Sequence, residues 1–396
     1  MLILGRLVAG FASGINTALP PVYLNEISPR TLRGAIGAIH PFAAAIGLLV
    51  SRILGLPYIL GNEWGWPILL AVSVIPMMYQ LVAFPFCPES PRYLFVEKSD
   101  ESATRHALQK LRNTSNVDAE LADFQRDHEL SKGAPRVTIG ELFKDPFLRK
   151  TTFIAIGVMV SQHLTGVIAV MYYSTAIFKS AGLVHGNQAI YGTIGLGVVN
   201  VVMTLAAVFL VEKTGRKRLL LIGLGGSIVF MSLLVVCTTQ SKATQLSHDS
   251  QFLGTINPYA VGSTISLVIY SIFVSIGPAA IPNLLVSELF ATAPRAAGSS
   301  VAVGVNRITG FAITLAFPYI KASIEEYTFV VFVVTLAVTI VFTKICVIET
   351  KGKTTEEIQY ELRHGQVMSK ASRHSTDVKP GTRDVAYYKV QTEEKL

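Results

Sequence analysis

The sequence predicts an all-α protein that crosses a membrane many times, and three observations lead to this prediction. Of its 396 residues, 51% are hydrophobic and only 15% are charged, whereas soluble domains carry roughly a quarter charged residues. The charges are also concentrated, because residues 88–150 and 349–396 hold 39 of the 60 Asp, Glu, Lys and Arg residues. The remaining sequence consists of long apolar runs with the length of membrane-spanning helices.

Nine apolar runs predict nine spans. Each run is about 20 residues or longer, which is the length that a helix needs to cross the hydrocarbon core of a bilayer. A large soluble protein with buried helices is the alternative, but the short polar loops leave too little polar surface to solvate it. The predicted spans cover residues 2–24, 34–56, 66–87, 151–178, 189–211, 219–238, 259–287, 296–320 and 328–348.

Lysine and arginine are concentrated in alternate loops, which predicts the orientation. Eleven of them lie between Arg92 and Lys150, whereas residues 57–65 contain none. Cytoplasmic loops carry such an excess of positive charge. We therefore expect the C-terminus in the cytoplasm and the N-terminus on the opposite side. This topology accounts for the net charge of +8, so the expected partner is the lipid bilayer and no nucleic acid is needed.

The spans and the polar segments predict four parts. Residues 1–87 hold three spans, and residues 88–150 form a cytoplasmic loop of short amphipathic helices. Residues 151–348 form a bundle of six spans, and residues 349–396 form a cytoplasmic tail that we expect to be disordered beyond about 365. In the loop, the apolar faces comprise Ala103, Ala107, Leu108 and Leu111 in one helix and Val117, Leu121 and Phe124 in the next.

Motifs for covalent chemistry are missing from the sequence. There is no H-E-x-x-H, no P-loop, no G-x-S-x-G and no set of cysteines and histidines at metal-ligand spacing. The three cysteines Cys87, Cys237 and Cys346 lie within spans or at their ends and are typical of small apolar side chains there. We therefore expect a protein that is not an enzyme, with no cofactor and no metal.

Charged clusters recur along the chain at a constant offset. The stretch "NEISPRTLRG" contains Glu26, and "SELFATAPRAAG" contains Glu288, which is 262 residues later; each acid is followed by an arginine after seven residues. Glu89 at the end of the third span and Glu349 at the end of the ninth are 260 residues apart. Two independent pairs with nearly equal offsets predict a duplicated unit of six helices.

A third cluster shows that the first repeat is shorter than the second. "VEKTGRKR" contains Glu212 and Arg216 between the fifth and sixth predicted spans, and its equivalent about 260 residues earlier would lie before Met1. Three spans precede the loop and six follow it. The repeat therefore predicts that three spans are absent from the front of this chain.

The charged side chains at the helix ends are candidates for a latch. Acid and arginine can pair across neighbouring helices and hold a transporter in one conformation. The alternative is that they cap helices and signal topology, which explains the arginines but does not explain the matched spacing. The candidate latch residues are Glu26, Arg33, Glu89, Arg92, Glu212, Arg216, Glu288 and Arg295.

Six motifs in order resemble the sugar porter family of the major facilitator superfamily, with the animal facilitative hexose transporters as the most similar branch. They are "LGRLVAG", "NEISPRTLRGA", "PFCPESPRYL", "QHLTGVIAVMYYSTAIF", "VEKTGRKR" and "SELF…PRAAG". The resemblance covers residues 1 to about 362. It implies a major facilitator fold of two six-helix bundles in which Met1 falls at the fourth span, so that the first three helices are lacking.

The resemblance also implies the function and its location. We expect transport of a sugar or a related small polar solute by alternating access, as facilitative uniport, in a multi-pass protein of the plasma membrane. No acid lies deep in a predicted span of this chain to relay protons, which favours uniport; the family's proton symporters carry their acid on the first span. Two alternatives stay open: a truncated membrane protein that does not transport, and an incomplete gene model.

Several positions match the family's sugar contacts. Amide side chains suit sugar hydroxyls because they both donate and accept hydrogen bonds. Gln162 matches the first of two paired glutamines, and Asn200 and Asn306 match asparagines of later spans. Tyr172 and Tyr173 match a tyrosine pair that closes the outer gate.

Other positions depart from the family pattern, so glucose specificity does not follow from the resemblance. His163 replaces the second glutamine, and Asn283 and Arg307 replace the two tryptophans of the cavity. Unpaired polar groups in a site change discrimination by roughly 10- to 10⁵-fold. The remaining departures are Pro41, Ile168, Ser275 and Gly310.

Arg307 and His163 raise specific hypotheses. Arg307 lies in the middle of a predicted span, where a charge is costly and usually functional. It favours an anionic sugar-like solute if it faces the cavity; the alternatives are that it reaches toward the cytoplasmic end or pairs with Glu288. His163 is expected to be a neutral, hydrogen-bonded cavity residue, with pH-sensitive transport as the alternative.

Overall fold

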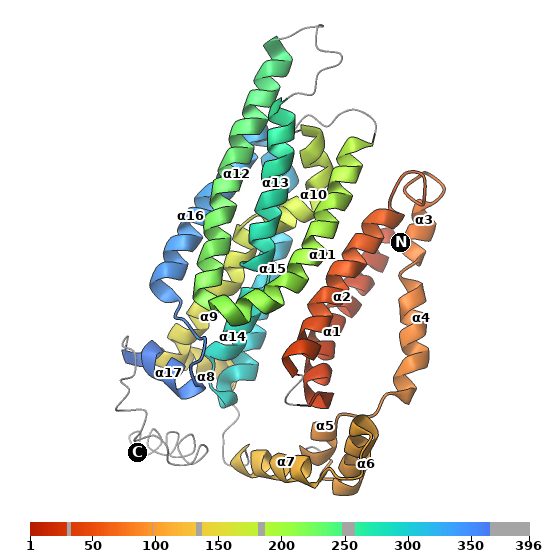
Figure 1. The fold of residues 1–396 in the computed structure, drawn as a ribbon, viewed down its shortest axis with the longest axis vertical. Coiled ribbons are helices and arrows are strands. Elements are labelled where there is room, and N and C mark those ends of the chain that lie inside the picture. Colours follow the sequence, from red (N-terminus) through yellow and green to blue (C-terminus); the bar gives the residue numbers. More distant parts are fainter. Residues whose placement is uncertain (30–32, 97, 132–136, 181–186, 248–257, 365–396) are drawn as a thin grey trace. The chain divides into compact units, whose positions relative to one another are not determined.

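The computed structural model describes residues 1–396 apart from 30–32, 97, 132–136, 181–186, 248–257 and 365–396. The regular elements of the described residues are all helices (Figure 1). These residues divide into two compact units. Unit 1 comprises Met1–Gly47 and the described residues from Leu54 to 131, and unit 2 comprises Leu48–Ile53 and the described residues of 137–364. The expected tail disorder beyond 365 lies outside the described residues.

Four α-helices and one short 3-10 helix form the apolar part of unit 1, except that Leu48–Ile53 of α2 belongs to unit 2. None of the side chains of α3 and α4 is buried, and α1 is similarly exposed. Helices that expose apolar side chains in this way are suited to a lipid surrounding. The elements are α1 (Leu2–Ile27), α2 (Arg33–Leu54), α3 (Trp66–Ala71), α4 (Val74–Ala83) and η1 (Phe84–Phe86).

The amphipathic helices expected in the polar loop of unit 1 are present. They are α5 (Pro91–Val96), α6 (Glu101–Arg112) and α7 (Asp118–Ser131). The carboxylate of Asp100 caps α6 by accepting the Ala103 N–H at 2.9 Å. Leu108 and Leu121 are buried, and the rings of Phe95 and Phe124 stack with centroids 6.5 Å apart. Leu108 and Leu121 both belong to the apolar faces that the periodicity of the sequence predicts for these helices.

Unit 2 contains the larger set of helices. Its first span begins at α9, where Pro146 follows an Asp145 carboxylate that accepts the Phe147 N–H at 2.8 Å. The elements are α8 (Ile139–Lys144), α9 (Pro146–Leu164), α10 (Val167–Ser180), α11 (Gln188–Thr214), α12 (Arg216–Ser247), α13 (Pro258–Ile276), α14 (Ile281–Leu289), α15 (Thr292–Ile324), η2 (Glu325–Tyr327), α16 (Thr328–Cys346) and α17 (Thr355–His364).

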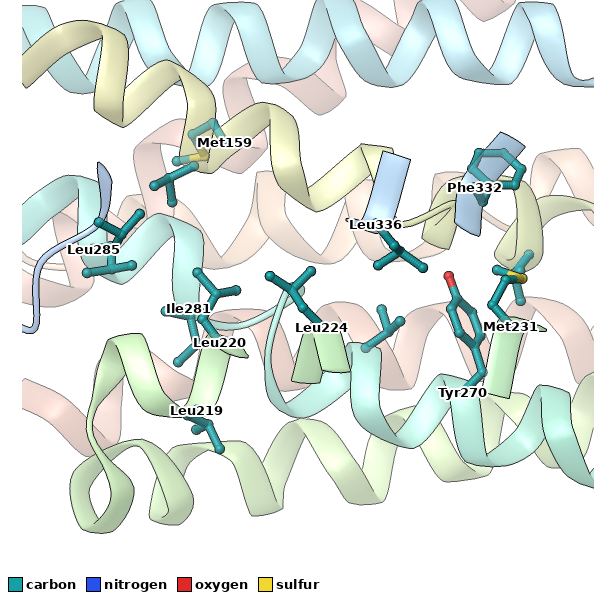
Figure 2. Packing of buried hydrophobic residues seen from close by; sticks show 14 of the residues in the cluster. Met159, Leu219, Leu220, Leu224, Met231, Tyr270, Ile281, Leu285, Phe332 and Leu336 are labelled. Atoms are coloured by element: carbon teal, nitrogen blue, oxygen red, sulfur yellow. The ribbon is translucent and has the colours of Figure 1, made fainter. Parts of the chain in front are cut away.

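The core of unit 2 runs along the centre of its bundle, as Figure 2 shows. Leu224 and Met231 of α12, Tyr270 of α13 and Leu336 of α16 are all almost completely buried. The hydroxyl of Tyr270 is within this apolar cluster and donates to the carbonyl oxygen of Thr165 at 2.6 Å. A buried hydroxyl needs such a partner, since an unpaired one costs free energy.

The helix count differs from the nine continuous spans expected. Eight of the described helices or helix pairs are long and apolar enough to cross a membrane, and the apolar part of α2, Ile39–Leu54, is shorter. The division into three and six spans is therefore not confirmed. Three predicted spans also consist of two helices each, which the apolar runs did not reveal: α3 with α4, α9 with α10, and α13 with α14.

Local backbone chemistry explains two of these breaks. Between α9 and α10 the chain passes through Gly166, whose φ of +84° is unfavourable for other residues. Between α13 and α14 the sequence reads Gly277-Pro278, and proline cannot donate the backbone hydrogen bond that a continuous helix requires. A glycine–proline dipeptide within an apolar run is therefore the signal that predicts such a break.

Helices α12 and α13 approach each other closely at a glycine contact. A Cβ at Gly223 would lie 2.7 Å from the Cα of Gly277 and 2.8 Å from the carbonyl oxygen of Phe273. Both neighbours belong to backbone, so they cannot move aside as a flexible side chain would. Small residues allow this kind of close helix packing inside membranes.

We predict opposite effects for two glycine substitutions on α12. Gly223→Ala should lower the thermal unfolding temperature of the purified protein, because overpacking costs about 1–3 kcal/mol. Gly225→Ala is the matched control, since nothing lies within 4 Å of a Cβ at that position. It should leave stability unchanged or raise it slightly through helix propensity. Equal effects of the two substitutions would contradict the close packing of α12 on α13.

Candidate functional site

The breaks in the two split spans of unit 2 meet at a glutamine side chain. Gln162 lies in the last turn of α9, and its Nε2 donates to the carbonyl oxygen of Ala279, between α13 and α14, at 3.1 Å. Another carbonyl near the first break, that of Leu164, accepts the Thr335 hydroxyl at 2.6 Å. An unpaired carbonyl inside a bilayer costs several kcal/mol, so side chains must replace the bonds that the helix breaks remove.

Asn306 of α15 extends this polar cluster. Its Nδ2 donates to Gln162 Oε1 at 2.9 Å and to the carbonyl oxygen of Met159 at 2.8 Å. Asn306 is buried and Gln162 is half-buried. The two amides therefore hold α9 against α15, and the second N–H of Gln162 has no described partner. An amide pair with a spare donor beside a helix break is an arrangement that can bind a hydroxyl group.

His163 lies beside these amides and is itself unpaired. Its side chain is buried with 6% exposure, and neither ring nitrogen has a described partner with hydrogen-bond geometry, although Asn306 is close. The ring occupies the space next to Gly310, where a Cβ would lie 3.1 Å from Nε2. A neutral, hydrogen-bonded histidine was expected here; within the part of the chain that the structure describes, no group makes a hydrogen bond to either ring nitrogen.

Arg307 follows Asn306 in the middle of the 33-residue helix α15 and is exposed. No carboxylate of the described residues pairs with it. Glu288, which was considered as its partner, instead binds Arg216 with an Nη2–Oε1 distance of 3.0 Å. Arg307 therefore presents an unneutralised charge at the middle of a span.

The remaining predicted solute contacts lie on other helices. Asn200 of α11 accepts hydrogen bonds at Oδ1 from the hydroxyls of Ser275, at 3.4 Å, and Thr204, at 3.5 Å. Asn283 of α14 is exposed and has no hydrogen-bond partner among the described residues. The structure thus brings Gln162 and Asn306 into contact, with His163 and Arg307 next to them in the chain. No described hydrogen bond links Asn200 or Asn283 to these four residues.

The two tyrosines of the expected gate have different environments. Tyr172 is 68% exposed. Tyr173 packs against Phe317 with ring centroids 4.9 Å apart, and its hydroxyl donates to the carbonyl oxygen of Thr314 at 3.5 Å. Tyr173 therefore joins α10 to α15, whereas the ring of Tyr172 is available for contacts outside unit 2.

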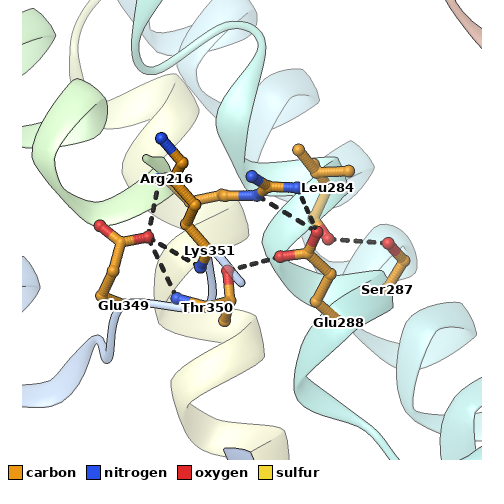
Figure 3. Close-up of polar contacts among 7 residues, drawn as sticks. All are labelled: Arg216, Leu284, Ser287, Glu288, Glu349, Thr350 and Lys351. Carbon is orange, nitrogen blue, oxygen red and sulfur yellow. Dashed lines mark hydrogen bonds and ion pairs between the residues drawn. The ribbon is translucent and has the colours of Figure 1, made fainter. Parts of the chain in front are cut away.

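A charged network joins α12, α14 and the segment after α16 (Figure 3). The Nε and Nη2 atoms of Arg216 both donate to Glu288 Oε1, at 3.2 and 3.0 Å, and the Thr350 hydroxyl donates to Oε2 of the same carboxylate. The carboxylate of Glu349 accepts backbone N–H groups of Arg216, Thr350 and Lys351 at 2.8–3.1 Å. A carboxylate at the first residue of α12 also suits the positive end of the helix dipole.

Unit 1 contains a contact that matches this network by sequence repeat. The Ser90 hydroxyl donates to Glu26 Oε2 at 2.5 Å, just as Thr350 donates to Glu288. Glu26 and Glu288 are the repeat-related acids, and Ser90 and Thr350 each follow the second acid of their repeat directly. Sequence reasoning missed both hydroxyls, although their position after Glu89 and Glu349 was a signal that could have found them.

The other candidate latch residues are less engaged. Arg295 donates to the carbonyl oxygen of Phe290, five residues before it, at 3.2 Å. Glu89, Arg92 and Glu212 are exposed. The side chain of Arg33 lies outside the described residues. Among the described residues, no group of three potential ligands is placed to hold a metal ion.

The fold is similar to the folds of solved membrane transporters. It matches the major facilitator superfamily proton:xylose symporter XylE, bound to 6-bromo-6-deoxy-D-glucose, with a TM-score of 0.70, 23% identity and coverage of 90% of this chain and 73% of XylE. The inward-open form of the xylose transporter XylE from E. coli gives a TM-score of 0.69 at 22% identity, over 90% and 72% of the two chains. At this identity the match shows a shared major facilitator fold.

The chain belongs to the family described as "Sugar (and other) transporter", whose model matches residues 1–362. It is 42% identical over 358 residues to the facilitated glucose transporter member 3 of solute carrier family 2 from Oryctolagus cuniculus, covering 90% of this chain and 69% of the relative. Identity to member 1 from Gallus gallus is 38% over 365 residues, covering 92% and 71%. These proteins are transporters and not enzymes, and the resemblance found in the sequence motifs is confirmed.

We predict that Glu349→Gln destabilises unit 2 at neutral pH. Burial disfavours the charged form of Glu349, but the N–H donors of Lys351, Arg216, Arg218 and Thr350 together outweigh it and hold its pKa below the ordinary value. The cost should be about 1–2 kcal/mol, since the carboxylate accepts charge-assisted hydrogen bonds. The measurement is the thermal unfolding temperature of wild type and variant as a function of pH.

The sign of this pH dependence follows from the lowered pKa. The stabilisation by the Glu349 carboxylate is fully present above the pKa of a glutamate in the unfolded chain, which is about 4.3. It is lost as the pH falls through the lower pKa that Glu349 has in the folded protein. Wild type and Glu349→Gln should therefore converge in acid. Glu212→Gln, at an exposed site, is the control and should change little at any pH. A constant difference between wild type and Glu349→Gln across the acid range would contradict this account.

Proposed function

We propose that the protein carries a sugar or a related small polar solute across a membrane by alternating access. The observation that carries this proposal is the cluster of Gln162 and Asn306 at the paired helix breaks of unit 2. Transporters commonly bind their solutes at interrupted helices near the middle of the bilayer. The relatives named as glucose transporters support a hydroxylated solute, since amides donate and accept hydrogen bonds as hydroxyls do.

The predicted contact residues have separate roles in this proposal. Gln162 and Asn306 bind solute hydroxyls directly, and His163 and Arg307 line the same polar patch. Asn200, tied to Ser275, contributes a second group of contacts, and Asn283 is exposed and ready to donate or accept. Tyr173 is already packed, so we assign the moving part of the outer gate to Tyr172.

The charged network is proposed to act as a conformational latch. In unit 2, Arg216 and Glu288 bind each other and are partly shielded, with 19% and 24% side-chain exposure. Breaking such a pair by removing one partner leaves an uncompensated charge. We assign the latch role also to Glu26, Arg33, Glu89, Arg92, Glu212, Glu349 and Arg295. A Glu288→Gln variant with unchanged solute exchange rates would contradict that role.

Uniport is the transport mode that we propose. No Asp or Glu lies within the apolar cores of the predicted spans, and proton relays in membrane transporters use such acids. An imposed proton gradient should therefore fail to drive the solute against its concentration gradient. Concentrative uptake under that gradient would contradict uniport.

The proposed location is the plasma membrane, with the C-terminus in the cytoplasm. The excess of lysine and arginine in alternate loops supports this orientation. The division into parts 1–87, 88–150, 151–348 and 349–396 is proposed as the functional organisation. Protease digestion of intact cells tests the orientation, because a C-terminal epitope that is cleaved from outside would contradict it.

A membrane protein that does not transport is the second candidate function. The chain spans 69% to 72% of the length of the first curated relatives it matches. Reconstitution of the full chain into vesicles distinguishes the two candidates. Solute uptake above that of empty vesicles supports transport, and its absence for every solute tested supports the second candidate.

We predict that Gln162→Leu lowers uptake of the transported solute by roughly 100-fold or more, since it leaves polar groups of the site unpaired. Radiolabelled uptake into vesicles measures this, and the unfolding temperature shows whether the variant is folded. Gln188→Leu, at an exposed residue that begins α11, is the matched control and should keep wild-type uptake. Wild-type uptake by folded Gln162→Leu would contradict the assigned site.

A further inference from the structure

We propose that His163 and Arg307 form a subsite for a carboxylate, so that the preferred solute is a polyhydroxy acid such as a sugar acid. This inference rests on the proposed function and names its substrate class. It is carried by two independent features of unit 2: a buried imidazole without partners and an unneutralised guanidinium in the middle of a span.

The imidazole of His163 is the first feature. Its side chain is 94% buried, since only 6% is exposed, yet both ring nitrogens are without a described partner. A buried polar group of this kind costs free energy until something binds it. Both N–H groups of the Asn306 amide are bound within the chain, whereas Gln162 keeps one spare N–H. The imidazole and this N–H are therefore the groups of the cluster that can bind an external ligand.

The position of Gly310 explains how the ring reaches this place. The Cβ of any other residue at 310 would lie 3.1 Å from His163 Nε2 and 3.0 Å from the Cδ1 of Ile168. These distances are tighter than ordinary contacts. The imidazole thus occupies the space that a side chain at position 310 would need. Because Gly310 of α15 has no side chain, His163 of α9 fits against it.

Arg307 is the second feature, and it lies on the same side of α15 as Gly310. Residues three apart on a helix are surface neighbours, so the base of Arg307 is next to the residue that His163 faces. A solute oxygen bound at the imidazole would therefore lie within the field of the guanidinium.

The charge of Arg307 has no counter-charge nearby in the described chain. Glu288 is bound to Arg216, and no Asp or Glu occurs within the apolar cores of the predicted spans. An isolated cation at the middle of a membrane is expensive, and such residues usually serve a substrate or ion. A carboxylate on the solute would supply the missing negative charge.

Carboxylate chemistry fits both groups. A guanidinium binds a carboxylate through two parallel N–H···O bonds, and the N–H of a neutral imidazole can donate to a carboxylate or hydroxyl oxygen. The hydroxyls of the same solute would bind Gln162. Arg307 and His163 thus supply hydrogen-bond donors for the carboxylate of a solute, and Gln162 supplies an amide for its hydroxyl groups. A solute that carries both kinds of group is a sugar acid.

The test measures uptake of radiolabelled glucuronate and glucose by the full chain in vesicles. Wild type should prefer glucuronate. Arg307→Gln should lower the ratio of glucuronate uptake to glucose uptake roughly 10- to 100-fold, the loss expected for a charge-assisted pair. Arg307→Lys should retain much of the preference. Lys321→Gln removes an equal charge from the last turn of α15 and should change neither solute.

A second variant tests the imidazole in a chain that keeps Arg307. His163→Gln retains a donor and an acceptor, so glucose uptake should persist while the preference for glucuronate falls severalfold. Unfolding temperatures show that the variants are folded. Glucose uptake with no preference for glucuronate, unaltered in Arg307→Gln, would overturn this inference and leave the proposed function standing. Uptake of neither solute by wild type would count against both.

Discussion

The requirement that every backbone carbonyl inside a bilayer be hydrogen-bonded underlies the architecture of unit 2. Two spans are interrupted there, and each interruption removes bonds that a continuous helix would make. Side chains replace them: Gln162 binds the carbonyl of Ala279, Tyr270 that of Thr165 and Thr335 that of Leu164. Polar groups are therefore already assembled where the helices break. A solute site at this place uses groups that the fold needs for its own stability.

The repeat explains why the ends of the helices are built alike. A hydroxyl that follows the second acid donates to the first acid in both units, from Ser90 to Glu26 and from Thr350 to Glu288. In unit 2, Arg216 adds an ion pair to this contact. The contact between hydroxyl and carboxylate is thus the part of the network that both units contain.

The fold class, the amphipathic loop helices and the family were predictable from hydropathy, periodicity and motifs, because each depends on local sequence. The helix breaks were not predicted, since hydropathy alone does not change at Gly166 or Gly277. The Gly277-Pro278 dipeptide is the local signal that could have found the break between α13 and α14. Candidate site residues were named from the resemblance to the family, but their partners in the structure were not predicted. That His163 lacks a partner and faces Gly310 depends on the packing of α9 against α15. Pairwise packing of this kind cannot be read from one sequence.

The central claim is that a solute binds at the paired helix breaks, on the amides of α9 and α15 and the unpaired imidazole beside them. A structure of the full chain determined with bound solute tests this most directly, with glucose and glucuronate compared. The account predicts solute oxygens within hydrogen-bond distance of Gln162 and of a His163 ring nitrogen. Solute bound elsewhere, with His163 still without a partner, would contradict it.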